Sequence, residues 1–132
     1  MNFANPDMVA HSGDLKATIK AIEIVDKVLG EMAKFVLERN GMILISADHG
    51  NAEELLSFPN KSFYYTSDKG ITNTDHSGNP VPIIIIANNL RGKGNILLRG
   101  SLQDIAPTIL GIMKLAVPAT MEGKDLLGNK NE

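Results

Sequence analysis

The sequence predicts an α/β fold in which helices cover a mainly parallel sheet. Two continuous apolar runs, 42–47 and 81–87, do not alternate with polar residues, which is typical of strands buried on both faces. Between Leu15 and Arg39, apolar residues recur every three or four positions, which is the period of an amphipathic helix. Buried strands and an amphipathic helix together indicate a sheet with helices packed on its faces.

A short helix is expected at the start of the chain. Asn5 is a suitable N-cap, Pro6 suits the first helical position, and Gly13 would end the turn that follows. Asp7 and His11 are four residues apart, so their side chains would share one face of this helix.

The next elements are a long helix and a buried strand. Asp14 can cap a helix over 15–39, whose apolar stripe would face the core. Gly41 is a stop signal for that helix, and the run 42–47 follows it as the first strand.

A polar stretch, 57–80, separates the two buried runs. It is long for a loop without structure of its own, which favours a functional role for this segment. The run 81–87 is then expected as the second strand, and a helix is expected over 101–113, with Pro107 close to its start.

Composition excludes several classes of protein. The 132 residues correspond to about one domain, and a net charge of -2 argues against a nucleic-acid partner. No apolar run reaches the roughly 18 residues of a membrane span, and the N-terminus lacks the features of a signal peptide, so a cytoplasmic location without membrane contact is expected. Cysteine is absent, so a metal ion would have to bind His, Asp or Glu.

Asp48 and His49 directly follow the first buried run. Ligands of open parallel sheets bind at the carboxyl ends of the strands, and Gly50 would let the backbone turn so that both side chains face one site. A carboxylate oxygen and an imidazole nitrogen suit Mn or Zn. A helix cap by Asp48 with His49 on the surface is an equally good interpretation of this dipeptide.

The histidines become informative when they are considered together. Each of them alone is more simply interpreted as a surface residue. However, His11, His49 and His76 all lie at expected helix, strand or loop ends, and two of them have Asp7 or Asp48 close by in the sequence. These five side chains are enough to contribute to two metal sites, and an α/β fold does not require them.

Four segments carry a family resemblance, and they occur in the order 2–13 (NFANPDMVAHSG), 47–53 (ADHGNAE), 76–82 (HSGNPVP) and 104–108 (DIAPT). Together they resemble the C-terminal part of the cofactor-independent, or 2,3-bisphosphoglycerate-independent, phosphoglycerate mutases of the alkaline phosphatase superfamily. The resemblance covers essentially the whole chain.

The resemblance implies a partial three-layer α/β/α domain of the alkaline phosphatase type that lacks its upstream strands. Residues 1–132 would be the C-terminal segment of the metal-binding, phosphatase-type domain of a larger protein, with the polar loop 57–80 inside it. Missing strands would leave an open sheet edge and bare apolar surface, so the fragment is expected to self-associate.

The resemblance also implies a ligand set. Two divalent metal ions, Mn by preference and Zn as the alternative, would flank a serine that is transiently phosphorylated. Asp7, His11 and His76 would be the ligands of one ion, and Asp48 and His49 part of the set for the other. The nucleophilic serine and the substrate-binding residues are expected upstream, so no catalytic residue is assigned. The isolated fragment is predicted to be inactive and to hold at most one metal ion, weakly.

The implied function is that of an isomerase of glycolysis and gluconeogenesis. It would interconvert 3-phosphoglycerate and 2-phosphoglycerate through a phosphoserine intermediate, with phosphoglycerate as its partner. Two alternatives remain open at this point. One is a fragment of another phosphatase or phosphodiesterase of the same superfamily, and the other is a metal-binding module without catalytic activity.

Overall fold

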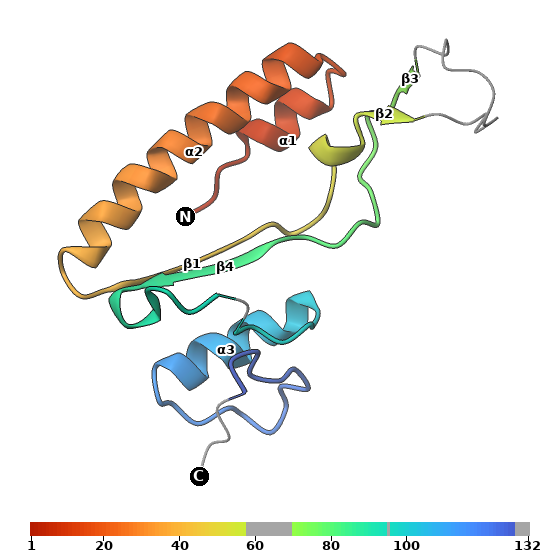
Figure 1. The fold of residues 1–132 in the computed structure, drawn as a ribbon. Helices are drawn as coiled ribbons and strands as arrows, with labels where there is room; N and C mark the ends of the chain where they lie inside the picture. The colour runs from red at the N-terminus through yellow and green to blue at the C-terminus, as the bar shows by residue number, and fades with distance from the viewer. Residues whose placement is uncertain (58–69, 95, 129–132) are drawn as a thin grey trace. The chain divides into compact units, whose positions relative to one another are not determined.

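A computed structural model gives the structure of the chain and describes residues 1–57, 70–94 and 96–128. The chain forms two compact units, Met1–Asn89 and Leu90–Glu132, and helices and strands occur along it as shown in Figure 1. The elements are, in order, α1 (Asn5–Ala10), α2 (Leu15–Leu37), β1 (Met42–Ser46), η1 (Ala52–Glu54), β2 (Leu56–Ser57), β3 (Ile71–Thr72), β4 (Ile83–Ala87), η2 (Asn88–Leu90), η3 (Leu102–Asp104) and α3 (Ile105–Ile112). These elements confirm the predicted α/β class.

The first unit begins with two helices that pack against each other (Figure 1). Gly13 has a φ of 71°, a conformation that glycine adopts without steric cost, and it reverses the chain between α1 and α2. Asp14 caps α2 as predicted, because its side chain accepts a hydrogen bond from the backbone nitrogen of Ala17 at 3.0 Å. The helix ends at Leu37, two residues before the predicted end.

The start of α1 differs from the expectation by one residue. Its N-cap is Ala4, which provides no side-chain hydrogen bond, and Asn5 is already helical. Pro6 therefore lies in the first turn, where a missing backbone N–H costs nothing because no intrahelical acceptor is available there.

The strands β1 and β4 coincide with the two predicted apolar runs, and they pair antiparallel with Met42 opposite Ala87 and Ser46 opposite Ile83. The expected parallel direction is therefore wrong for this pair. A continuous apolar run indicates that both faces of a strand are covered, whereas its direction depends on the connection. Among the described residues between the two strands there is no crossover α-helix. The chain instead reverses direction and runs back antiparallel to β1.

The returning chain forms a long antiparallel arm. Gly50 and Ser77 form an isolated bridge beyond the end of β1, and β2 pairs with β3 farther along the arm. The described part of the predicted polar loop 57–80 thus contains backbone pairing, while residues 58–69 of that loop lie outside the described residues. The arm brings residues far apart in the sequence next to each other, which builds the site below.

The apolar stripe of α2 is less buried than its pattern predicts. Leu15, Ile19 and Ile22 are 47%, 49% and 45% exposed. The sheet that contacts α2 consists of β1 and β4 among the described residues, so it offers little surface on which these side chains could pack. Large exposed apolar surface of this kind usually marks a contact with other protein.

In the second unit, α3 is tied to the chain that follows it. The buried carboxylate of Asp104 accepts a hydrogen bond from the backbone nitrogen of Lys124 at 2.8 Å. The buried hydroxyl of Thr108 accepts one from the backbone nitrogen of Leu126 at 2.9 Å. These bonds hold Leu126, which is 2% exposed, in the core of the unit. None of the helices in the described part of the chain is long and apolar enough to span a membrane.

Candidate metal centre

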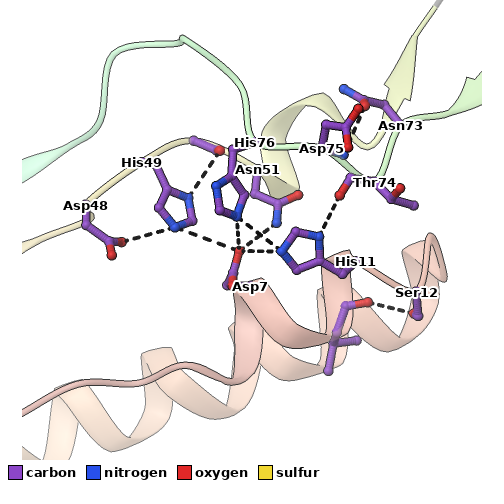
Figure 2. Close-up of polar contacts among 12 residues, drawn as sticks. Asp7, His11, Ser12, Asp48, His49, Asn51, Asn73, Thr74, Asp75 and His76 are labelled. Carbon is purple, nitrogen blue, oxygen red and sulfur yellow. Dashed lines mark hydrogen bonds and ion pairs between the residues drawn. The ribbon is translucent and has the colours of Figure 1, made fainter.

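The carboxylate of Asp7 lies at the centre of a histidine cluster (Figure 2). Its Oδ1 is 3.3 Å from Nε2 of His11 and 3.3 Å from Nε2 of His76, and these two nitrogens are 3.1 Å apart. Asp7 lies in α1 and His11 caps the C-terminal end of that helix, so the two side chains lie close together as their spacing predicted, while His76 comes from the returning side of the arm. The structure therefore brings together the three side chains to which one ion was assigned.

The distances between these three atoms suit a shared divalent ion. Ligand atoms bound to one ion at about 2.1 Å lie roughly 3.0–3.4 Å from one another in octahedral or tetrahedral arrangements. The three separations in the cluster, 3.1, 3.3 and 3.3 Å, fall in that range. One carboxylate oxygen and two imidazole nitrogens also form a donor set that suits Mn or Zn. The residues present thus fit a metal ion.

The ring of His11 is held in the orientation that a metal ligand needs. Its Nδ1 lies 2.6 Å from the backbone carbonyl of Thr74, which can only accept, so Nδ1 is assigned as the N–H donor. In the neutral ring, Nε2 then carries the lone pair, and it faces Asp7 and His76. A hydrogen bond from the other ring nitrogen to a carbonyl is the usual support of a histidine that binds metal.

His49 joins the cluster, whereas Asp48 lies at its margin. Nε2 of His49 is 4.0 Å from Oδ1 of Asp7, and its ring stacks on that of His76 with centroids 3.6 Å apart. Asp48 Oδ1 is 3.7 Å from His49 Nε2, and the side chain of Asp48 is 81% exposed. The structure therefore brings His49 close to the other three side chains, but Asp48 contacts the cluster only through His49.

The pKa of the Asp7 carboxyl lies below its usual range. The main cause is a hydrogen bond of 2.7 Å from the side-chain amide of Asn51 to Oδ1, and the nearby imidazoles of His11, His76 and His49 lower it further. Asn51 is 5% exposed, and its Oδ1 accepts no hydrogen bond from the described residues. Asp7 is thus an anion at neutral pH, ready to bind a cation.

Sequence reasoning assigned no role to the residues that support the cluster. Glu53 accepts hydrogen bonds from the Ser77 hydroxyl, from the Asn79 amide at 3.1 Å and from the backbone nitrogen of Asn51 at 2.8 Å. The Ser77 hydrogen bond is the main reason why the pKa of Glu53 falls to about 2. These residues lie inside the segments 47–53 and 76–82, but their linear spacing carries no signal that the two segments meet.

Comparison with known proteins adds a family to this geometry. The model of the metalloenzyme superfamily matches residues 1–117. A 2,3-bisphosphoglycerate-independent phosphoglycerate mutase of Desulforudis audaxviator is 47% identical over 96% of the chain, and one of Clostridium beijerinckii is 45% identical over 98%. In both cases the chain spans 23% of the length of the relative.

A solved structure is similar as well. A phosphoglycerate mutase of Leishmania mexicana, crystallised at low cobalt concentration, superposes with a TM-score of 0.73 at 30% sequence identity. The similarity covers 94% of this chain and 24% of that protein. The fold is therefore similar to one part of a larger enzyme.

Proposed function

The chain belongs to the metalloenzyme superfamily, and on that premise we propose that it is the metal-binding part of a 2,3-bisphosphoglycerate-independent phosphoglycerate mutase. The observation that carries the proposal is the convergence of Asp7, His11 and His76 at distances that suit a shared ion. The mutase relatives, at 42–47% identity, favour this reaction over those of other phosphatases or phosphodiesterases.

In the proposed reaction, this chain supplies ligands and the rest of the enzyme supplies the nucleophile. Bound divalent ions would lower the pKa of a serine hydroxyl and stabilise the oxygens that exchange a phosphoryl group between 3-phosphoglycerate and 2-phosphoglycerate. Asp7, His11 and His76 hold one ion in this proposal. Asp48 and His49 provide part of a second set, which the 132 residues alone do not complete. Manganese is the proposed ion, and the cytoplasm the proposed location.

We expect the 132-residue chain to bind one equivalent of Mn²⁺ weakly, and His76→Ala to lower the affinity at least tenfold. The reason is that His76 is one of three ligands that meet, whereas the described residues offer no third ligand that would join Asp48 and His49 around a second ion. Isothermal titration calorimetry with Mn²⁺ at neutral pH measures both the stoichiometry and the dissociation constant. The affinity should fall as the pH is lowered, because ligand imidazoles must be neutral.

Lys20→Ala is the matched control, because Lys20 lies on the solvent side of α2 and pairs with Glu23. It should bind Mn²⁺ like the wild type. Two tight equivalents per chain, or an affinity that His76→Ala leaves unchanged, would contradict the ligand assignment.

We also expect the 132-residue chain to self-associate. Leu15, Ile19 and Ile22 on α2 and Ile84 on β4 are each 45–49% exposed, and a two-stranded sheet has open edges that can pair with another copy. Light scattering at low micromolar concentration should show a dimer or larger species. A species of about 14 kDa, the mass of one chain, would count against this expectation.

A further inference from the structure

We propose that Glu53 is a positioning residue for the metal centre. It holds segment 76–79 against the turn after β1, so that His76 faces Asp7. This inference rests on the proposed function, since it concerns the placement of one of the proposed ligands. Glu53 itself contacts none of the ligand side chains and acts through its neighbours.

The contacts of Glu53 join the two sides of the arm. Its Oε2 accepts a hydrogen bond from the backbone nitrogen of Asn51, 2.8 Å away on its own side. Its Oε1 accepts from the Ser77 hydroxyl and from the side-chain amide of Asn79, at 3.1 Å, on the returning side. One carboxylate thus spans both sides, and hydrogen bonds to a charged acceptor are stronger than neutral ones.

The backbone alone makes a weak connection at this point. The backbone nitrogen of Ser77 donates to the carbonyl of Gly50 at 2.8 Å, and this pair is an isolated bridge rather than part of a ladder. A Cβ at Gly50 would collide with the ends of the Ser77 and Glu53 side chains. The ends of the Ser77 and Glu53 side chains thus fill the space beside Gly50 where the two sides meet.

The ring of His76 is only partly covered by the residues around it. Its side chain is 47% exposed, and its contacts are with the other members of the cluster, Asp7, His11 and His49. A half-exposed ring takes its position from the backbone that carries it. Glu53 accepts a hydrogen bond from the hydroxyl of Ser77, the residue that follows His76, and in this way restrains the backbone beside His76.

Glu53→Gln tests the proposal, because it preserves the size of the side chain but replaces one acceptor oxygen with a donor. We expect the dissociation constant for Mn²⁺ to rise about tenfold in the 132-residue chain, the lower end of the range for residues that support metal ligands, because Glu53 acts on His76 through Ser77. The helical signal in circular dichroism should be retained. Glu31→Gln is the matched control, because Glu31 is an exposed residue of α2 and its substitution removes the same charge. It should bind within twofold of the wild type.

The Ser77 variants provide a second test if Glu53→Gln fails to fold. Ser77→Ala removes the hydroxyl and should weaken Mn²⁺ binding in the same way, whereas Ser77→Thr retains the hydroxyl and should bind like the wild type. In the double variant, the loss of binding free energy for Mn²⁺ should be smaller than the sum of the losses in Glu53→Gln and Ser77→Ala, since both substitutions break one shared contact.

Different results separate the two proposals. One result is that His76→Ala weakens Mn²⁺ binding whereas Glu53→Gln and Ser77→Ala do not. This result would overturn the role of Glu53 and would leave the metal centre supported. Equal losses of affinity in Glu53→Gln and Glu31→Gln would show that the net charge, and not the position of Glu53, sets the affinity for Mn²⁺, and would also overturn the role of Glu53. Failure of the wild type to bind Mn²⁺ would overturn the metal centre and this inference with it.

Discussion

A polypeptide of these 132 residues is expected to leave 3-phosphoglycerate unconverted, even with Mn²⁺ present. The proposed reaction needs a serine nucleophile and substrate-binding residues that none of the matched motifs supplies, and the chain spans 23% of the length of its mutase relatives. Loss of a nucleophile alone lowers turnover by about 10⁶-fold in a well-studied serine protease. The formation of 2-phosphoglycerate, coupled to enolase and followed by absorbance, should stay at background.

The control for this assay addresses contamination by a host mutase. His49→Ala, purified in parallel, removes a member of the histidine cluster but leaves any contaminant untouched. Equal background rates in both preparations agree with the prediction. Turnover that survives stringent purification and disappears in His49→Ala would show that the chain is itself catalytic.

Asp7→Asn is expected to weaken Mn²⁺ binding by about 100-fold or more. Oδ1 of Asp7 lies within 3.3 Å of two imidazole nitrogens and 4.0 Å of the third, so this oxygen is the shared centre of the cluster. An asparagine can still accept the hydrogen bond from Asn51, which means that the substitution removes the charge and leaves the shape. Loss of a hydrogen-bond partner of a metal ligand typically lowers the metal affinity about 10–100-fold, and loss of a ligand such as Asp7 should lower it at least as much as the upper value.

Titration calorimetry on Asp7→Asn and on Asp26→Asn makes this comparison. Asp26 is an exposed residue of α2, so its substitution changes the net charge equally but should leave the dissociation constant within about twofold of the wild type. Equal effects of the two substitutions would indicate diffuse attraction between the chain and the ion rather than ligation by Asp7.

The pH dependence follows from the lowered pKa of Asp7. Since the pKa of Asp7 in the folded chain lies below its usual value of 3.8, the ionised carboxylate stabilises the fold above that value. This contribution is lost as the pH falls through the lowered pKa. Between neutral pH and pH 5 Asp7 therefore stays charged. Any loss of Mn²⁺ in that interval, measured by titration calorimetry at pH 5 and pH 7, should not come from protonation of Asp7.

The sequence predicts the elements of the fold better than their pairing. The helix that Asp14 caps and the two apolar runs are found close to their predicted bounds, because periodicity and capping are local properties. The antiparallel direction of β1 and β4 was missed, since it depends on how the chain between them returns. No local pattern in the apolar runs records that direction.

For the site, spacing identified the pair on α1 and the residue types identified the other candidates. Asp7 and His11 could be placed on one face because four residues make about one helical turn. The family resemblance implied that His76 joins that pair, but spacing alone could not show it, since the contact spans 65 residues. The roles of Asn51 and Glu53 were missed for the same reason. Asn51 contacts Asp7, which is 44 positions away, and Glu53 contacts Ser77, which is 24 positions away.

The pairing of β2 with β3 has a consequence for engineering this chain. Leu56 faces Thr72 and Ser57 faces Ile71 in that short ladder, which closes the arm on the side away from the β1 and β4 pair. Backbone pairing thus flanks the Gly50 and Ser77 bridge, with β1 and β4 before it and β2 and β3 beyond it. This pairing sets the distance between the two halves of the arm, independently of how many residues connect Ser57 to Ile71. A foreign peptide or a fluorescent reporter inserted between Ser57 and Ile71 should leave the histidine cluster in place, because the paired residues on either side of the insertion fix the separation of its ends.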